Sequence, residues 1–289
     1  MQLNDMLAEE GIDPKGVMVF RHRPKERELR KVLPWLADEN PELFNAYQQT
    51  QREVVEKAML RAKFVASFIG HEPGKAVFVG LYKVNGHKPL SYDQYWDEPK
   101  NAELKNKYGV GGPTEKDSTT LWFDLVPLEF RKEWKGKLIV CWPGQELSWH
   151  RWANQNEFQI HAITEDSILS REMPKWDRLV LSWNELEVLP KKWCEDLSRW
   201  RGIYFLLDES DGKGYVGAAY GQDNLLGRWR SYAQSGHGGN KKLRDRKPEN
   251  FVFSILQIVA HDMEPDEVQA LEANWKDRLH TREFGLNDN

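Results

Sequence analysis

The sequence predicts an α+β fold divided into two domains. Its 289 residues exceed what one small core needs, and a hydrophobic fraction of 40 % with 13 Trp, 9 Tyr and 12 Phe suffices for packed interiors. Apolar residues recur at helical spacing early in the chain, and short apolar runs broken by Gly, Pro and Asn follow. We expect an N-terminal domain at 1–200, helical over 1–70 and mainly β over 75–185, and a C-terminal domain at 201–289.

The first domain carries local signals for both kinds of element. Asn40 followed by Pro41 is typical of a helix start, and apolar residues from Leu43 to Met59 recur at roughly helical spacing. The glycine-rich stretch 97–117 predicts a long loop. Strands are expected at five apolar runs, which are residues 77–84, 120–126, 137–142, 158–163 and 178–183.

The second domain begins with two aromatic triplets. GIY at 202–204 and YVG at 215–217 flank the turn-rich stretch 208–214, which predicts a β-hairpin. Taken alone, such triplets are equally typical of ordinary strands. A helix, a strand and a second helix are expected after them, at residues 223–234, 251–259 and 265–279.

Both helices of this domain present polar groups that invite a functional interpretation. Arg228 and Tyr232 lie four residues apart and share one helix face, although a surface arginine beside a core-bordering tyrosine would look the same. On the last helix, Glu272 lies beside an apolar stripe that runs from Val268 to Leu279. A carboxylate there needs an ionic partner, a bound cation or access to water.

Charge and composition restrict the function classes. With 41 Lys and Arg against 45 Asp and Glu, the net charge is −4, so any nucleic-acid binding must use local basic patches, such as residues 21–31 and 241–247. Cys141 and Cys194, the two cysteines, have no spacing typical of a zinc site or a disulfide framework. A signal-peptide pattern and an apolar run of about 18 residues are both missing, so we expect a cytoplasmic protein without a membrane partner.

Jointly, the motifs of residues 201–289 resemble the GIY-YIG nuclease family. The resemblance rests on both triplets, on Arg228 with Tyr232, on Glu272 in the last long helix, and on Asn287 after Gly285-Leu286. It implies a small three-stranded antiparallel sheet flanked by helices. Ala218 departs from the pattern, because some members have a lysine there; Lys213, Lys241 or Lys242 could replace it.

The resemblance also implies roles for the motif residues. Glu272 should hold one divalent ion, Mg²⁺ or Mn²⁺, and Arg228 should bind the phosphate, for which its planar charged group is suited. Tyr204, Tyr215 and Tyr232 should surround the attacking water. Tyr204 is the first candidate for the base and Tyr215 the second, although a phenolate costs roughly 4 kcal/mol at pH 7. Asn287 should keep the C-terminal segment in register with the site.

DNA is the expected partner. A basic loop after the Arg228 helix could grip the backbone; its members are Lys241, Lys242, Arg244, Arg246 and Lys247. In the first domain, Trp149, Arg151 and Trp152 could stack on bases and bind phosphate, or could belong to a Trp-rich β core.

The sequence thus predicts a metal-dependent endonuclease that hydrolyses DNA phosphodiester bonds, with its target chosen by the N-terminal domain, as in restriction, phage defence or repair. A non-cleaving nucleic-acid-binding module on the same fold and an RNA-directed nuclease remain alternatives. The oligomeric state stays open, and a homodimer would suit double-strand cleavage.

Overall fold

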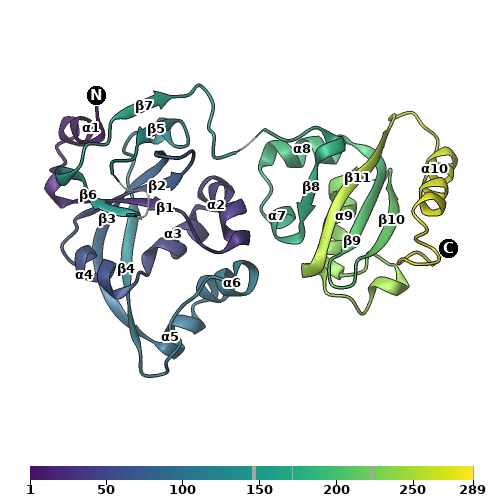
Figure 1. Cartoon of the computed structure of the whole chain (residues 1–289), viewed down its shortest axis with the longest axis horizontal. Helices are drawn as coiled ribbons and strands as arrows, with labels where there is room; N and C mark the ends of the chain where they lie inside the picture. The colour runs from purple at the N-terminus through teal and green to yellow at the C-terminus, as the bar shows by residue number, and fades with distance from the viewer. Residues whose placement is uncertain (145–147, 171, 222–223, 289) are drawn as a thin grey trace. The chain divides into compact units, whose positions relative to one another are not determined.

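The computed structural model describes residues 1–144, 148–170, 172–221 and 224–288. The chain divides into two compact units, Met1–Arg171 and Glu172–Asn289 (Figure 1). Both units combine helices with a sheet, in agreement with the predicted mixture of the two. None of the helices in the described part of the chain is long and apolar enough to cross a membrane.

A seven-stranded sheet runs through the described residues of the first unit. Its strands follow the order β6-β1-β2-β3-β5-β7, and β4 pairs with β3. Strands β1 and β2 run parallel, whereas the other neighbouring strands are antiparallel. Their bounds are β1 Val17–His22, β2 Phe64–Gly70, β3 Lys75–Ser91, β4 Thr119–Pro127, β5 Leu138–Cys141, β6 His150–Trp152 and β7 Ile160–Ile163.

Helices precede, connect and follow these strands. Asn40 caps α3, because its side-chain oxygen accepts a hydrogen bond from the backbone nitrogen of Leu43 at 3.2 Å; this confirms the predicted helix start before Pro41. The helices of the unit are α1 Leu3–Glu9, α2 Arg27–Glu39, α3 Pro41–Gln49, α4 Glu53–Met59, α5 Tyr92–Asp97 and α6 Pro99–Tyr108.

Two expectations for the first unit are wrong. Residues 1–70 are not simply helical, because β1 and β2 lie within them; β1 is buried along its whole length, so it lacks the polar alternation that marks a half-exposed strand. The expected loop at 97–117 contains α6, which starts at Pro99. The helix ends before Gly109, whose backbone adopts the left-handed conformation with φ 69°.

The second unit contains a four-stranded antiparallel sheet in its described residues, in the order β10-β9-β11-β8 (Figure 1). The predicted order of hairpin, helix, strand and helix is found. Its strands are β8 Val180–Ser182, β9 Arg201–Asp208, β10 Lys213–Ala219 and β11 Phe251–Val259. Its helices are α7 Trp183–Glu187, α8 Lys191–Arg199, α9 Asn224–Ser235 and α10 Pro265–Arg278.

The strand β8 changes both the expected strand number and the expected boundary. It pairs with the first half of β11 through Val252, Phe253 and Ser254, so the sheet has four strands where three were expected. Because β8 belongs to this sheet, the second unit begins at Glu172, about thirty residues before the expected boundary at Arg201. A segment remote from the hairpin in sequence completes its sheet, and no local pattern indicates that pairing.

Alternation along the hairpin separates two layers. Ile203 and Val216 pack with Val268 of α10 on one face. Tyr204 lies on the other face, where its ring contacts Trp229 of α9 and where Trp229 contacts Phe253 of β11. The hairpin is therefore covered by α10 on one side and by α9 on the other.

In the first unit, a buried polar network joins two strands to a helix. His22 of β1 shares a hydrogen bond of 3.2 Å between its Nε2 and Oε1 of Gln48 in α3, and the Ser67 hydroxyl of β2 donates to the same oxygen at 2.5 Å. All three side chains are buried. Burial lowers the pKa of His22 to about 4, against an opposing contribution from the Gln48 hydrogen bond, so the folded protein keeps this imidazole neutral at pH 7.

We predict that acid destabilises the first unit through His22. The unfolded chain takes up a proton there below about pH 6.5, whereas the folded chain does so only near pH 4. Stabilisation is therefore complete above pH 6.5 and falls towards pH 4, by roughly 2 to 3 kcal/mol at pH 4.5. Urea unfolding of the full chain at pH 7.0 and 4.5 should show a smaller loss for His22→Gln than for the wild type. Equal losses would contradict the assignment.

Candidate functional site

Four of the predicted site residues meet on the α9 face of the sheet. The phenol oxygens of Tyr204 and Tyr232 are hydrogen-bonded at 2.9 Å, and Nε of Arg228 donates to the Tyr204 hydroxyl at 3.3 Å. The ring of Tyr215 has its centroid 5.8 Å from that of Tyr232 and 6.4 Å from that of Tyr204. The guanidinium carbon of Arg228 lies 5.3 Å from the Tyr232 centroid. One strand pair and one helix thus assemble three tyrosines around an arginine.

The glycine of the second triplet makes room for the first. Gly217 on β10 is paired directly with Tyr204 on β9. A Cβ atom at Gly217 would overlap the hydroxyl and the ring of Tyr204. Gly238 plays the same part for Tyr232, whose ring occupies the space that a Cβ would need. The tyrosine rings therefore lie over bare backbone, which explains why this pattern requires glycine.

Burial controls the acidity of this cluster. Tyr204 and Tyr232 are fully buried, and removal from water raises the pKa of each phenol well above its usual value, even though Arg228 acts in the opposite direction. Both phenols are neutral at pH 7. Tyr204 also has no exposed surface through which to contact an attacking water, so the structure does not support its predicted role as the base. Tyr215, at 8 % exposure, and the partly buried Arg228 are the accessible members.

Glu272 lies on α10, which packs against the opposite face of the sheet. Its carboxylate Oε1 is 3.0 Å from the ammonium nitrogen of Lys276, and the two side chains are only 18 % and 9 % exposed. Among the contacts of the described residues, none joins Glu272 to Arg228 or to the tyrosines. Its expected convergence with them is therefore not observed. The ionic partner Lys276 was not expected from the sequence, although a Glu followed by a Lys four residues later on a helix is a signal for such a pair.

Ala218, at the position where some family members have a lysine, also faces α10. Ala218 packs in the layer with Ile203, Val216 and Val268. A lysine side chain at this position would accordingly point towards α10 and away from Tyr204. Lys276 already supplies a cation on α10, whereas the predicted substitute Lys213 has its ammonium 3.8 Å from Asp211 in the hairpin turn.

The residues present provide limited ligation for a divalent metal. No group of three His, Cys, Asp or Glu side chains suited to metal ligation occurs among the described residues. A single carboxylate is nevertheless sufficient for a magnesium ion that keeps most of its waters. Glu272 fits as that ligand in kind and is partly exposed, but an ion would have to share the carboxylate with Lys276 or displace it.

Asn287 ties the C-terminal segment to the edge of the hairpin. Its side-chain oxygen accepts from the backbone nitrogen of Val216 and its amide nitrogen donates to the Val216 carbonyl, both at 2.9 Å. One residue earlier, the backbone nitrogen of Leu286 donates to the carbonyl of Gly214 at 2.8 Å. Asn287 is buried, so its amide acts as one more rung of the β10 ladder, as a register-keeping role requires.

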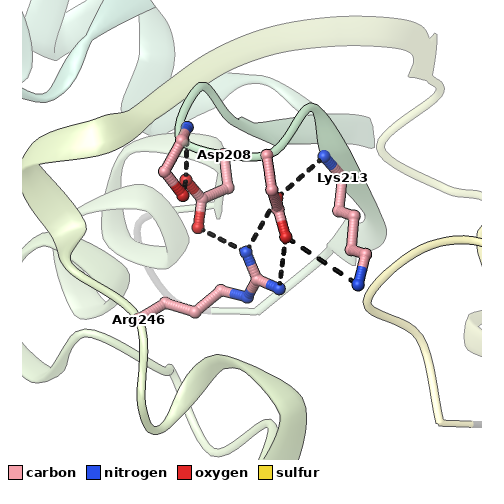
Figure 2. Close-up of polar contacts among 5 residues, drawn as sticks. Asp208, Lys213 and Arg246 are labelled. Atoms are coloured by element: carbon pink, nitrogen blue, oxygen red, sulfur yellow. Dashed lines mark hydrogen bonds and ion pairs between the residues drawn. The ribbon is translucent and has the colours of Figure 1, made fainter.

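The predicted basic loop divides into anchored and exposed side chains. Arg246 bridges two carboxylates of the hairpin, those of Asp208 and Asp211 (Figure 2). Its Nη1 is 2.7 Å from Asp208 Oδ2 and 2.9 Å from Asp211 Oδ1. Its Nη2 is 3.0 Å from Asp211 Oδ2. Lys242 donates to the backbone oxygen of Asn287 at 2.6 Å. The remaining members are exposed: Lys241, Arg244 and Lys247.

The aromatic and basic residues proposed to bind nucleic acid in the first unit have partners within that unit. The ring of Trp149 lies 5.2 Å from that of Phe20, and the Arg61 guanidinium lies 5.6 Å from the Trp152 ring. Arg151 donates to Asn156 Oδ1 at 3.1 Å. All three predicted residues are partly buried, an arrangement that favours the packing alternative.

Comparison with known proteins adds an independent finding for the second unit. Residues 201–287 match the family model described as the GIY-YIG catalytic domain, and such a domain implies a nuclease-type activity. Among solved structures, a mutant of the catalytic domain of intron endonuclease I-TevI matches with 22 % identity and a TM-score of 0.27, over 31 % of this chain and 94 % of that one. No curated protein matches the chain. By the family match, residues 201–287 form a GIY-YIG domain.

Proposed function

We propose that this protein is an endonuclease that hydrolyses DNA phosphodiester bonds with one divalent metal ion. The observation that carries the proposal is the position of Arg228. Arg228 is partly exposed beside the GIY and YVG strands, and its Nε donates to the hydroxyl of the buried Tyr204. A permanently charged fork fixed in this way is suited to the oxygens of a phosphodiester.

Each member of the cluster then has a distinct task. Arg228 binds the phosphoryl oxygens through its outer nitrogens while Nε stays bound to Tyr204. Tyr204 and Tyr232 act as positioning residues, because both are buried and neutral. Tyr215, the more exposed phenol, orients the attacking water and passes on its proton. This assignment places Tyr215 before Tyr204 as the residue that handles the proton, because Tyr204 is fully buried and burial raises its pKa.

Glu272 is the residue that would hold the metal ion. When bound, the ion would supply Lewis-acid stabilisation of the charge on the phosphate and on the leaving oxygen. Lys276 neutralises the same carboxylate, so the affinity for the ion should be low. The Glu272–Lys276 pair is also the observation that favours the second candidate, a nucleic-acid-binding module that does not cleave.

Target selection by the first unit, a cytoplasmic setting and homodimer formation remain predictions. A cleavage assay separates the candidate functions most simply. The full chain should nick or cut plasmid DNA in the presence of Mg²⁺ or Mn²⁺ and not in EDTA. Cleavage confined to RNA would favour the RNA-directed nuclease, and binding without cleavage under all metal conditions would favour the non-cleaving module.

We predict that Arg228→Met lowers the cleavage rate by about 100-fold, the usual order for loss of one group that stabilises transition-state charge. Tyr204→Phe should lower it by about tenfold, since Arg228 loses its acceptor and Tyr232 loses its hydroxyl partner. DNA affinity, measured by fluorescence anisotropy, should change little in Tyr204→Phe. A Tyr204→Phe enzyme with unchanged cleavage rates would refute the positioning role.

A further prediction concerns the metal ligand. Lys276→Met removes the competing ammonium, so Mn²⁺ should bind the full chain at least tenfold more tightly than in the wild type. Electron paramagnetic resonance of free Mn²⁺ measures this without reference to activity. Lys276→Met combined with Glu272→Gln is the matched control and should return to weak binding. Affinity that does not depend on Glu272 would exclude this carboxylate as the ligand.

A further inference from the structure

The contact in Figure 2 links two segments that are far apart in the chain. Arg246 belongs to the basic loop between α9 and β11, whereas Asp208 is the last residue of β9 and Asp211 lies in the turn that follows it. Asp208 is 1 % exposed and also accepts from the hydroxyl and the backbone nitrogen of Ser210, at 2.6 and 2.9 Å. The hydrogen bonds from Ser210 thus hold the Asp208 carboxylate in place independently of Arg246.

Three of the five N–H groups of the guanidinium donate in this contact. Nη1 bridges the two aspartates, and Nη2 donates to the second oxygen of Asp211. An arginine that binds a phosphate with the same fork would have to leave both carboxylates. Hydrogen bonding to Arg246 holds the pKa of Asp211 below its usual range, so the pair persists across neutral pH. Arg246 is therefore poorly placed to bind DNA directly, contrary to the expectation from sequence.

Both segments also carry exposed cations close in sequence to the contact residues. Arg244 and Lys247 lie two residues before and one residue after Arg246 in the loop, and both are exposed. Lys213 lies at the end of the turn, with its ammonium 3.8 Å from Asp211, and is half exposed. The Asp211 carboxylate is thus shared between Lys213 and Arg246, and it holds the basic loop against the hairpin turn.

We propose that Arg246 is a positioning residue that fastens the basic loop to the hairpin turn, so that Lys213, Arg244 and Lys247 form one surface for the phosphate backbone of duplex DNA. This inference rests on the proposed function, from which it takes DNA as the partner. It explains why two aspartates lie within a surface that binds DNA. Their repulsion of the phosphates is offset because they hold the basic side chains in fixed positions.

The test uses a substitution for which charge and positioning predict opposite signs. Asp211→Asn removes a negative charge, so charge alone would tighten DNA binding. Loss of the anchor should instead weaken binding of the full chain to a fluorescein-labelled duplex of about 20 base pairs, by about fivefold in Kd at low salt. The matched control is Asp245→Asn, an exposed aspartate in the same loop, which should tighten binding slightly.

Two further variants complete the design. Arg246→Lys keeps the charge but cannot bridge both carboxylates, so it should weaken binding as Asp211→Asn does. Arg244→Met should reduce the slope of log K against log salt by about one, as expected for a lost phosphate contact. Thermal unfolding identifies any variant that fails to fold, in which case Arg246→Lys takes the place of Asp211→Asn.

Equal tightening by Asp211→Asn and Asp245→Asn would overturn the positioning role, as would wild-type affinity in Arg246→Lys. A wild-type protein that binds duplex DNA but does not cleave it would refute the proposed nuclease and leave this inference standing. A wild-type protein that does not bind duplex DNA at all would overturn both.

Discussion

The hydrogen bond between the hydroxyls of Tyr204 and Tyr232 is the interaction on which the site depends. It joins β9 to α9 in a fully buried place, and it can form because Gly217 leaves space for the Tyr204 ring. A buried phenol without a partner would cost about 1 to 3 kcal/mol, so the pair fixes the helix on the sheet. Arg228 inherits its orientation from this arrangement, since its Nε is bound to Tyr204.

The hairpin and the Arg228 helix could be predicted from the sequence, because their signals are local. The hairpin follows from two triplets and a turn-rich stretch, and Arg228 with Tyr232 follows from helical spacing. The roles within the cluster could not be predicted in the same way. Exposure depends on the packing of α9, which left Tyr204 without access to water and made Tyr215 the better candidate. The strand β1 and the pairing of β8 were also beyond reach, since total burial and long-range pairing leave no periodic pattern.

Charged side chains show the same limit. Sequence treats all members of a basic run alike, yet Arg246 is bound to two aspartates, Lys242 holds the C-terminal segment, and Arg244 is exposed. Likewise, the apolar stripe beside Glu272 left an ionic partner, a cation or water open, and the family resemblance implied a metal, whereas the structure pairs Glu272 with Lys276. In this domain, acids and bases are used first to hold segments in place, and what remains exposed defines the surface offered to a nucleic acid.

We propose that Tyr204 contributes to catalysis through Arg228, and a double-mutant cycle measures this coupling. The cleavage rates of Tyr204→Phe, Arg228→Met and the double variant would be compared with that of the wild type on one plasmid substrate. If Tyr204 acts only by orienting Arg228, the double variant should cleave no more slowly than Arg228→Met alone. A double variant slowed by the product of the two single effects would show that Tyr204 has an independent role in the chemistry and would contradict the account.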